Sequence, residues 1–216
     1  MTPKFASAVD PVFSYVLELL DALERGVARE PAEEHEAIKG LISQGEAKVG
    51  TTAEWMAAKY ALAAWIDELL IFATWPGHIW WSENTLEWSF FQSNDRATQF
   101  YEVNKEATKC TDKDAAEVFY LCVVLGFRGL YRAAEQDSSV AEEYGLPITV
   151  LAWLDQSALG LRTGGRVKEM TTRPTTPESA PPHNAQAVLM SSWLVAAVLG
   201  AFTVIIAVLT YTFPST

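Results

Sequence analysis

An uncharged run of 21 residues, 193–213 (WLVAAVLGAFTVIIAVLTYTF), constrains this chain more than any other feature of its sequence. The polar groups in the run are Thr203, Thr210, Tyr211 and Thr212. A helix rises about 1.5 Å per residue, so a run of this length matches the roughly 30 Å of hydrocarbon in a bilayer. Trp193 and Tyr211 lie near its ends, where amphipathic rings favour the headgroup region. We therefore predict a single transmembrane helix over residues 191–213, followed by a short periplasmic tail at 214–216.

Two alternatives to a membrane span are a buried core helix and a signal peptide. A core helix is usually shorter and carries a polar face, and the N-terminal residues lack the apolar stretch of a signal peptide. All 16 Lys and Arg and all 27 Asp and Glu lie at or before Glu178. The basic residues just before the run are Arg162, Arg166, Lys168 and Arg173, and none follows it. Positive charge stays inside, so we expect a single-pass protein whose N-terminal domain is cytoplasmic.

Residues 161–190 are rich in Pro and Thr, which predicts a flexible linker between the domain and the membrane. The basic residues of this linker either bind anionic membrane lipid or only fix the topology, and the sequence leaves both open. Within the span, Gly200 has small alanines nearby, and small residues let helices approach closely. Self-association through the span is therefore left open as well, although no strict GxxxG motif is present.

The pattern of residues 1–160 predicts an all-α domain, because apolar residues recur at helical spacing and the alternation typical of strands is not seen. Asp10 and Pro11 are typical of a helix start, as is Pro31, and Thr51 and Thr52 are expected to cap a third helix through about residue 74. That helix should end at Trp75-Pro76-Gly77. A loop with Trp80 and Trp81 should follow, and then a short helix over residues 83–91 with Ser82 as its cap. Three more helices are predicted: one from Asp95 to about residue 109, one from Asp112 or Asp114 through residue 127, and one that begins at Pro147. The stretch 118–127 is apolar on every side, which predicts a central buried helix.

Asp67 and Glu68 form the most suggestive pair of acids in the chain. Neighbouring helix positions diverge by about 100°, so the two carboxylates cannot flank one substrate bond. Asp67 shares a helix side with Tyr60, and a buried carboxylate needs a partner. We interpret Asp67 as a hydrogen-bonded structural acid in preference to a catalytic one.

Other candidate chemistry is sparse. His35, His78 and His183 lie in unrelated contexts without ligand spacing, so no metal site is expected. Cys110 and Cys122 form no CxxC motif and fit a reducing compartment. Residues 126–129 lack the glycine spacing of a phosphate cradle, and no cofactor is expected. The net charge of −11 argues against nucleic acid as a partner.

Four tryptophans crowd into one short stretch: Trp75, Trp80, Trp81 and Trp88. They fit either a core that packs a loop between helical layers or an exposed aromatic patch for a protein partner. We favour the core interpretation, and the sequence does not decide between the two.

Three motif blocks resemble a known family. Residues 59–68 read KYALAAWIDE, Trp80-Trp81-Ser82 and Leu86-Glu87 follow, and then come Phe90-Phe91 and Phe100-Tyr101. Residues 120–132 read YLCVVLGFRGLYR. In this order the blocks resemble the YALAAxxDE, aromatic and YLCLxLGFxGxYR blocks of the DotU/TssL (IcmH) family of secretion-system membrane proteins. The resemblance covers roughly residues 10–160, and we expect no peptidoglycan-binding extension such as some members carry.

The resemblance implies a cytoplasmic domain of two small helical bundles, anchored in the inner membrane of a Gram-negative bacterium. It further implies a scaffolding role in type VI secretion, or in type IVB secretion, with no enzymatic activity. The implied partners are an IcmF/TssM-like inner-membrane protein and cytoplasmic baseplate components. The resemblance also implies that certain motif residues pack in the domain or contact a partner: Tyr60, Asp67, Glu68, Trp80, Trp81, Gly126, Phe127, Gly129, Tyr131 and Arg132. The membrane anchor is marked by Trp193, Gly200, Tyr211 and Phe213.

Two other functions remain as alternatives at this point. One is a membrane-tethered enzyme that uses Asp67 or Glu68 as an acid or base. The other is a generic tail-anchored adaptor outside secretion.

Overall fold

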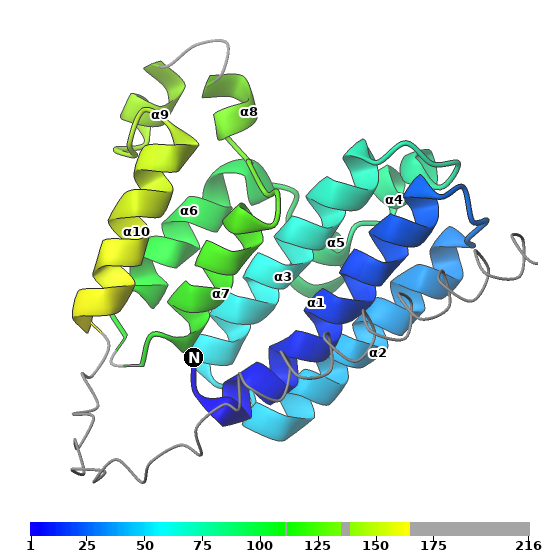
Figure 1. Ribbon diagram of the computed structural model, residues 1–216, viewed down its shortest axis with the longest axis horizontal. Coiled ribbons are helices and arrows are strands. Elements are labelled where there is room, and N and C mark those ends of the chain that lie inside the picture. The colour runs from blue at the N-terminus through cyan, green and yellow to red at the C-terminus, as the bar shows by residue number, and fades with distance from the viewer. Residues whose placement is uncertain (111, 135–138, 165–216) are drawn as a thin grey trace, which may run out of the picture. The chain divides into compact units, whose positions relative to one another are not determined.

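The computed structural model describes residues 1–110, 112–134 and 139–164. Every regular element in these ranges is a helix, which confirms the predicted all-α class (Figure 1). The predicted span, its tail and nearly all of the predicted linker lie outside the described residues, and so do Trp193, Gly200, Tyr211 and Phe213. Within the described part of the chain, no helix is both long enough and apolar enough to cross a membrane.

The described residues form helices of two or more turns and several shorter ones. The longer helices are α1 (Pro3–Glu24), α2 (Pro31–Val49), α3 (Ala53–Phe72), α6 (Arg96–Ala107), α7 (Asp114–Val124) and α10 (Val150–Gly164). The shorter helices are α4 (His78–Glu83), α5 (Leu86–Phe91), α8 (Tyr131–Ala134) and α9 (Ser139–Glu143).

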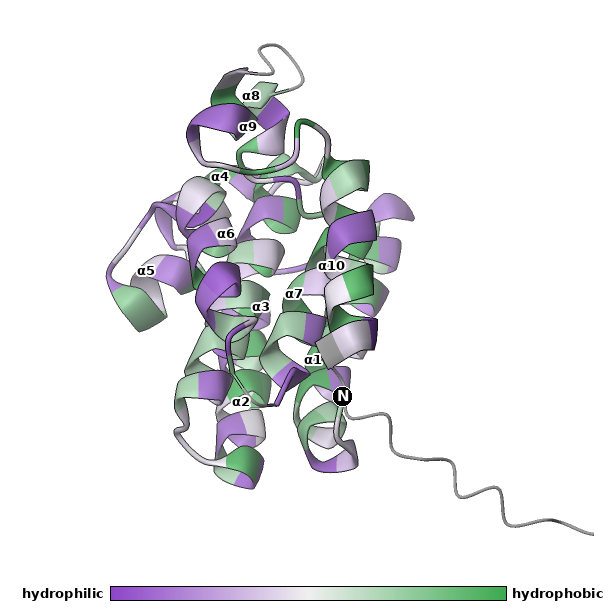
Figure 2. Ribbon diagram, turned by 90° about the vertical axis from the view of Figure 1, so that its left-hand side faces the viewer, coloured by the Kyte–Doolittle hydropathy of each residue, from purple (hydrophilic) through white to green (hydrophobic). Residues whose placement is uncertain are grey.

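Helix α3 lies at the centre of the helical domain (Figure 1). The hairpin of α1 and α2 packs on one side of it, and α6 and α7 pack on the other, with α10 outside α7. Both groups bury apolar side chains against α3, so Trp55, Trp65 and Ile66 are fully buried and one continuous core results. Figure 2 shows hydrophilic as well as hydrophobic residues along the outer helices α2, α6 and α10, as expected for helices with one buried face.

The first helix begins earlier than the sequence indicated. Thr2 caps α1 by accepting a hydrogen bond from the Phe5 N–H at 3.4 Å, and Pro11 lies inside the helix. Pro11 has no N–H to donate to the Ser7 carbonyl one turn earlier. The Nζ of Lys48 in α2 donates to that carbonyl at 2.8 Å instead. The predicted start at Asp10-Pro11 is wrong because a neighbouring helix satisfies the group that the proline leaves unpaired.

Two further boundaries differ from the prediction. Trp80 and Trp81 lie in α4 and not in a loop, and Thr85 rather than Ser82 caps α5, accepting from the Trp88 N–H at 3.2 Å. Helix α7 ends at Val124, which is half exposed, so the stretch through residue 127 is neither one helix nor buried on every side. Gly126 turns the chain there with a φ of 112°, a conformation that side chains with a Cβ rarely adopt.

The last helix begins at Val150, three residues after Pro147, and its first turn is closed by Thr149, whose Oγ1 accepts from the Ala152 N–H at 3.2 Å. Helix α10 continues to Gly164, past residue 160. The short helices α8 and α9 were not predicted from the sequence, because a single helical turn has too few residues to show a hydrophobic period.

Candidate functional site

Asp67 is fully buried on the side of α3 that faces α4 and α5. Its Oδ1 accepts hydrogen bonds from the Trp81 Nε1 and the Leu86 N–H, each at 2.9 Å, and its Oδ2 accepts from the Glu87 N–H at 2.8 Å. Leu86 and Glu87 are the first residues of α5, whose N–H groups have no partner within the helix. Asp67 therefore fixes the start of α5 and the indole of α4 to the central helix.

Glu68 points to the other side of α3 and is almost fully buried. Its Oε1 accepts from the Arg128 N–H at 2.8 Å and from the Arg132 Nε at 2.9 Å, and its Oε2 accepts from the Gly129 N–H at 2.9 Å. The two neighbouring acids thus hold two different segments on opposite sides of one helix. Their divergence excludes a paired acid and base acting on one substrate.

The segment held by Glu68 joins α7 to α8 through a tight turn. Gly129 has a φ of 54°, and a Cβ added there would lie 2.8 Å from the Ala97 carbonyl oxygen and from the Phe127 ring. That carbonyl accepts the Leu130 N–H at 2.9 Å, so the turn lies directly against α6. The Phe127 ring stacks on Phe100 with centroids 3.9 Å apart. Four residues of the third motif block lie in or next to this turn: Gly126, Phe127, Gly129 and Tyr131.

A second buried network surrounds Glu87, whose burial was not predicted from the sequence. The Tyr60 hydroxyl donates to Glu87 Oε1 at 2.8 Å, and Arg96 Nη1 lies 3.6 Å from Glu87 Oε2. Burial raises the pKa of the Tyr60 hydroxyl, so it remains the donor in this pair. An acid in the first turn of a helix normally lies in solvent and interacts with the helix dipole. Nothing in the local sequence indicates that the Glu87 side chain is buried.

The four tryptophans separate into two kinds. Trp75 and Trp81 are buried and Trp80 is partly buried, whereas Trp88 is 49% exposed. Trp75 donates from its Nε1 to the Leu70 carbonyl at 2.8 Å, and Trp81 donates to Asp67. The cluster is therefore mainly core, with Trp88 at the surface.

His35 of α2 lies against this tryptophan core. Its ring meets Trp80 and Trp81 edge-on, with centroids 5.7 and 5.4 Å apart, and its Nε2 is buried without a hydrogen-bond partner among the described residues. Burial lowers the pKa of His35, and the nearby Lys39 lowers it further against an opposing effect of Glu36.

We expect His35 to make the domain less stable as the pH falls. Below the unfolded-state pKa of about 6.5, the unfolded chain binds a proton at His35 that the folded chain resists, so the unfolding free energy decreases. Denaturant unfolding of the wild type and of His35→Phe at pH 7.5 and 5.5 measures the effect. The stability of the wild type relative to the variant should fall between the two pH values, and an unchanged difference would contradict the assignment.

An exposed aromatic ring lies beside the Glu68 network. Phe72, at the end of α3, is 60% exposed, and the Arg132 guanidinium lies over its ring at 4.1 Å from the centroid. Arg132 also donates to Glu68, so the exposed pair is attached directly to the buried acid. A shallow groove lined by residues 71–76 and His78 continues from Phe72 along the end of α3.

These contacts limit what the site can do chemically. Both acids of the pair use their oxygens to accept N–H donors of the chain itself, and both are buried away from solvent. Within the described ranges no group of three His, Cys, Asp or Glu side chains could hold a metal ion. The two acids therefore act by holding α4, α5 and the turn before α8 to α3.

The chain is similar to a protein family and to a solved structure. A family model described as "Type VI secretion system protein DotU" matches residues 4–213. The fold is similar to the "Cytoplasmic domain of TssL from Acinetobacter baumannii", with a TM-score of 0.60 and 23% sequence identity over 74% of this chain and 98% of that chain. No curated protein matches the chain.

Proposed function

Because the chain belongs to the DotU family of type VI secretion system proteins, we propose that it is a structural scaffold in the membrane complex of such a system. The observation that carries the scaffolding role is the use of Asp67 and Glu68. Both acids bind main-chain N–H groups of other segments, so this pair holds the helical domain together and presents no free reactive group.

We place this scaffold at the bacterial inner membrane, with residues 191–213 as its single span and the helical domain in the cytoplasm. Length and hydropathy of the run support the span, and the basic residues before it support the orientation. In this position the helical domain is the part available to cytoplasmic baseplate components. The proposed partner at the membrane is an IcmF/TssM-like inner-membrane protein. We also place self-association of the chain, and its contact with membrane lipid, at the span.

We propose that the Phe72–Arg132 pair contributes to the contact with a type VI partner. Aromatic residues, Phe among them, and Arg are enriched in protein interfaces, and this pair presents both at the surface. Glu68 holds Arg132 in place, so the pair is preorganised and loses little side-chain freedom on binding.

The test is affinity capture of the tagged full-length chain from solubilised membranes of its own bacterium. The wild type is expected to enrich type VI components, and Phe72→Ala should lower the recovery of at least one of them severalfold. Leu159→Ala is the matched control, because Leu159 is 63% exposed, is also apolar and lies on α10 away from the pair. Capture without any type VI component would contradict the proposed function, and equal recovery with both variants would contradict the proposed contact.

A further inference from the structure

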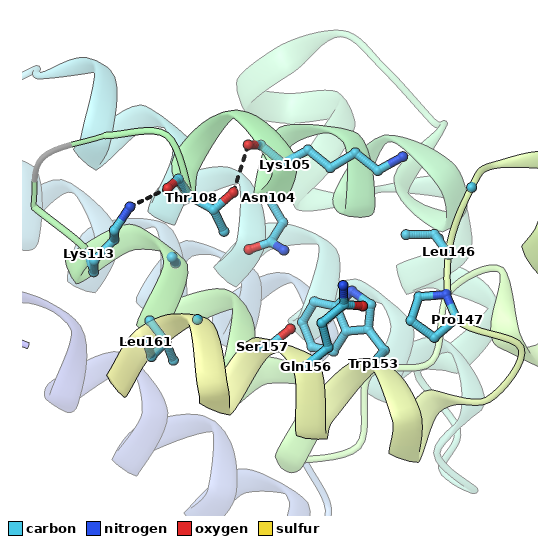
Figure 3. A pocket seen from close by; sticks show the side chains of 13 residues that line it. Asn104, Lys105, Thr108, Lys113, Leu146, Pro147, Trp153, Gln156, Ser157 and Leu161 are labelled. Atoms are coloured by element: carbon cyan, nitrogen blue, oxygen red, sulfur yellow. Dashed lines mark hydrogen bonds between the residues drawn. The ribbon is translucent and has the colours of Figure 1, made fainter. Parts of the chain in front are cut away.

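The cleft between α6, α7 and α10 and the end of α3 both carry positive charge, in different arrangements. The cleft has a volume of about 310 Å³ and contains Lys105 and Lys113 (Figure 3). Their ammonium groups lie at opposite ends of the cleft and donate to two different carbonyl groups, those of Tyr144 and Thr108. The two charges are therefore not brought together for one partner group. At the end of α3, a single guanidinium is held in a fixed orientation.

This guanidinium belongs to Arg132, which is fixed on two sides and open on a third. Its Nε donates to Glu68 Oε1 at 2.9 Å, and its guanidinium carbon lies 4.1 Å from the centroid of the Phe72 ring. The Nη1 and Nη2 groups make no hydrogen bond to a described residue. The side chain is 41% exposed, so a partner can reach this edge. The N–H groups along the edge of a guanidinium match the two oxygens of a carboxylate.

The local charge at the end of α3 is opposite in sign to that of the chain. The sequence has 27 acidic and 16 basic residues. Glu68 is almost fully buried, and Arg132 balances its charge. Arg128 adds a second guanidinium, which donates to two main-chain carbonyls at 2.9 Å and forms no ion pair with a described residue. The groove beside this pair is lined by residues 71–76 and His78, and none of them is an acid. An acidic partner group therefore meets attraction here.

The groove next to Arg132 suits an apolar side chain. Trp75 lines it and is buried, and its Nε1 donates to the Leu70 carbonyl at 2.8 Å. Gly77 packs tightly against it, because a Cβ added there would lie 2.4 Å from the indole and 2.5 Å from Pro31 of α2. This wall is thus fixed before a partner binds, which lowers the entropic cost of binding. Phe72 joins the two parts, since it lines the groove and lies under the guanidinium.

We propose that the end of α3 recognises an acidic side chain of a type VI partner. An Asp or Glu carboxylate of the partner accepts hydrogen bonds from Nη1 and Nη2 of Arg132, and an apolar side chain near it packs on Phe72 in the groove. This inference rests on the proposed contact at the Phe72–Arg132 pair and adds the chemistry of the partner. Glu68 and Phe72 already hold the guanidinium in one orientation, so little freedom is lost when a carboxylate binds.

The first measurement is affinity capture of the tagged full-length chain from solubilised membranes, read for the type VI component that Phe72→Ala loses. Arg132→Met should lower its recovery about tenfold, because charge-assisted hydrogen bonds to the carboxylate are lost. Recovery by the wild type should fall severalfold between about 0.1 M and about 0.5 M NaCl, because salt screens an exposed ion pair. Lys109→Met is the matched control and should leave recovery unchanged, because Lys109 pairs with Glu106 beside the start of α3 and not its end.

A conservative variant separates recognition from folding. Arg132→Lys keeps the positive charge but lacks the planar fork, so its recovery should lie between those of the wild type and Arg132→Met. Circular dichroism shows whether each variant keeps its helical content. If Arg132→Met loses its helical spectrum, the salt dependence of the wild type and the crosslinked segment described next decide.

Photo-crosslinking identifies the partner's acid. A photo-reactive amino acid in place of Thr74, which lines the groove, should link to a partner segment that contains an Asp or Glu beside an apolar residue. Reversing that acid to Lys in the partner should lower capture by the wild type and restore capture by Arg132→Glu.

The outcomes separate this inference from the proposed function. Capture without any type VI component would contradict the proposed function and this inference with it. Three results would overturn the inference and leave the contact in place. They are equal recovery by the wild type and Arg132→Met while Phe72→Ala loses the component, recovery by the wild type that salt does not change, and a crosslinked segment without an acid.

Discussion

Replacing Gly129 with Ala is expected to lower the unfolding free energy by about 3 kcal/mol, the combined effect of a left-handed backbone and an overpacked contact. The new Cβ would lie 2.8 Å from the Ala97 carbonyl oxygen, which belongs to the backbone of α6 and cannot rotate away. Relief requires the turn to move, and movement weakens the hydrogen bonds from Gly129 to Glu68 and from Leu130 to Ala97.

Gly145→Ala separates packing from backbone strain in this experiment. Gly145 has a φ of 61°, close to the 54° of Gly129, but a Cβ there meets no atom within 4 Å. The control should therefore cost about 1 kcal/mol, from conformational strain alone. Denaturant unfolding of both variants measures the difference, and equal losses would show that the turn does not pack as described.

Replacing Asp67 with Asn is expected to destabilise the domain by about 2–4 kcal/mol, because a buried hydrogen-bonded acid loses part of its network. The Asn oxygen can still accept from Trp81 and Leu86, but its NH₂ group would face the Glu87 N–H, and two donors cannot pair. Asp10→Asn is the control, since Asp10 is exposed on α1 and should change stability by about 0.5 kcal/mol or less. An enzyme that used Asp67 as its acid or base would instead keep its stability in Asp67→Asn and lose turnover.

The Asp67 variant also has an expected pH dependence. Burial raises the pKa of Asp67 from 3.8 to about 7, against the opposing effect of the hydrogen bonds from Glu87, Leu86 and Trp81. Between these values the folded chain holds a proton that the unfolded chain releases, so the contribution of Asp67 to stability is lost as the pH rises through this window. The stability gap between wild type and Asp67→Asn should be larger at pH 5 than at pH 8. A gap that widens with rising pH would contradict the assignment.

The sequence predicted the parts of the fold that depend on local pattern. The extent of α3, from its Thr52 cap to its end before Trp75-Pro76-Gly77, follows from residues next to one another, as do the starts of α2 and α6. The family was recognised from three motif blocks, and the family-model match confirms it. The predictions failed where a distant residue decides the outcome. Pro11 remains helical because Lys48 comes from another helix, and Trp80 and Trp81 are helical because Asp67 and the tryptophan core hold α4.

The candidate site was predictable in the same partial way. Helical geometry alone separates the directions of Asp67 and Glu68, and the side shared with Tyr60 indicates that Asp67 is buried. The partners of the two acids lie between 14 and 64 residues away along the chain, so no local period identifies them.

The most direct test of the scaffolding account is deletion of this chain in its own bacterium, with type VI-dependent secretion as the measurement. We predict that deletion abolishes secretion and that the wild type and Leu159→Ala restore it. Phe72→Ala should restore it only in part, at an equal amount of folded protein in the membrane. Secretion that continues undiminished after deletion would contradict the account.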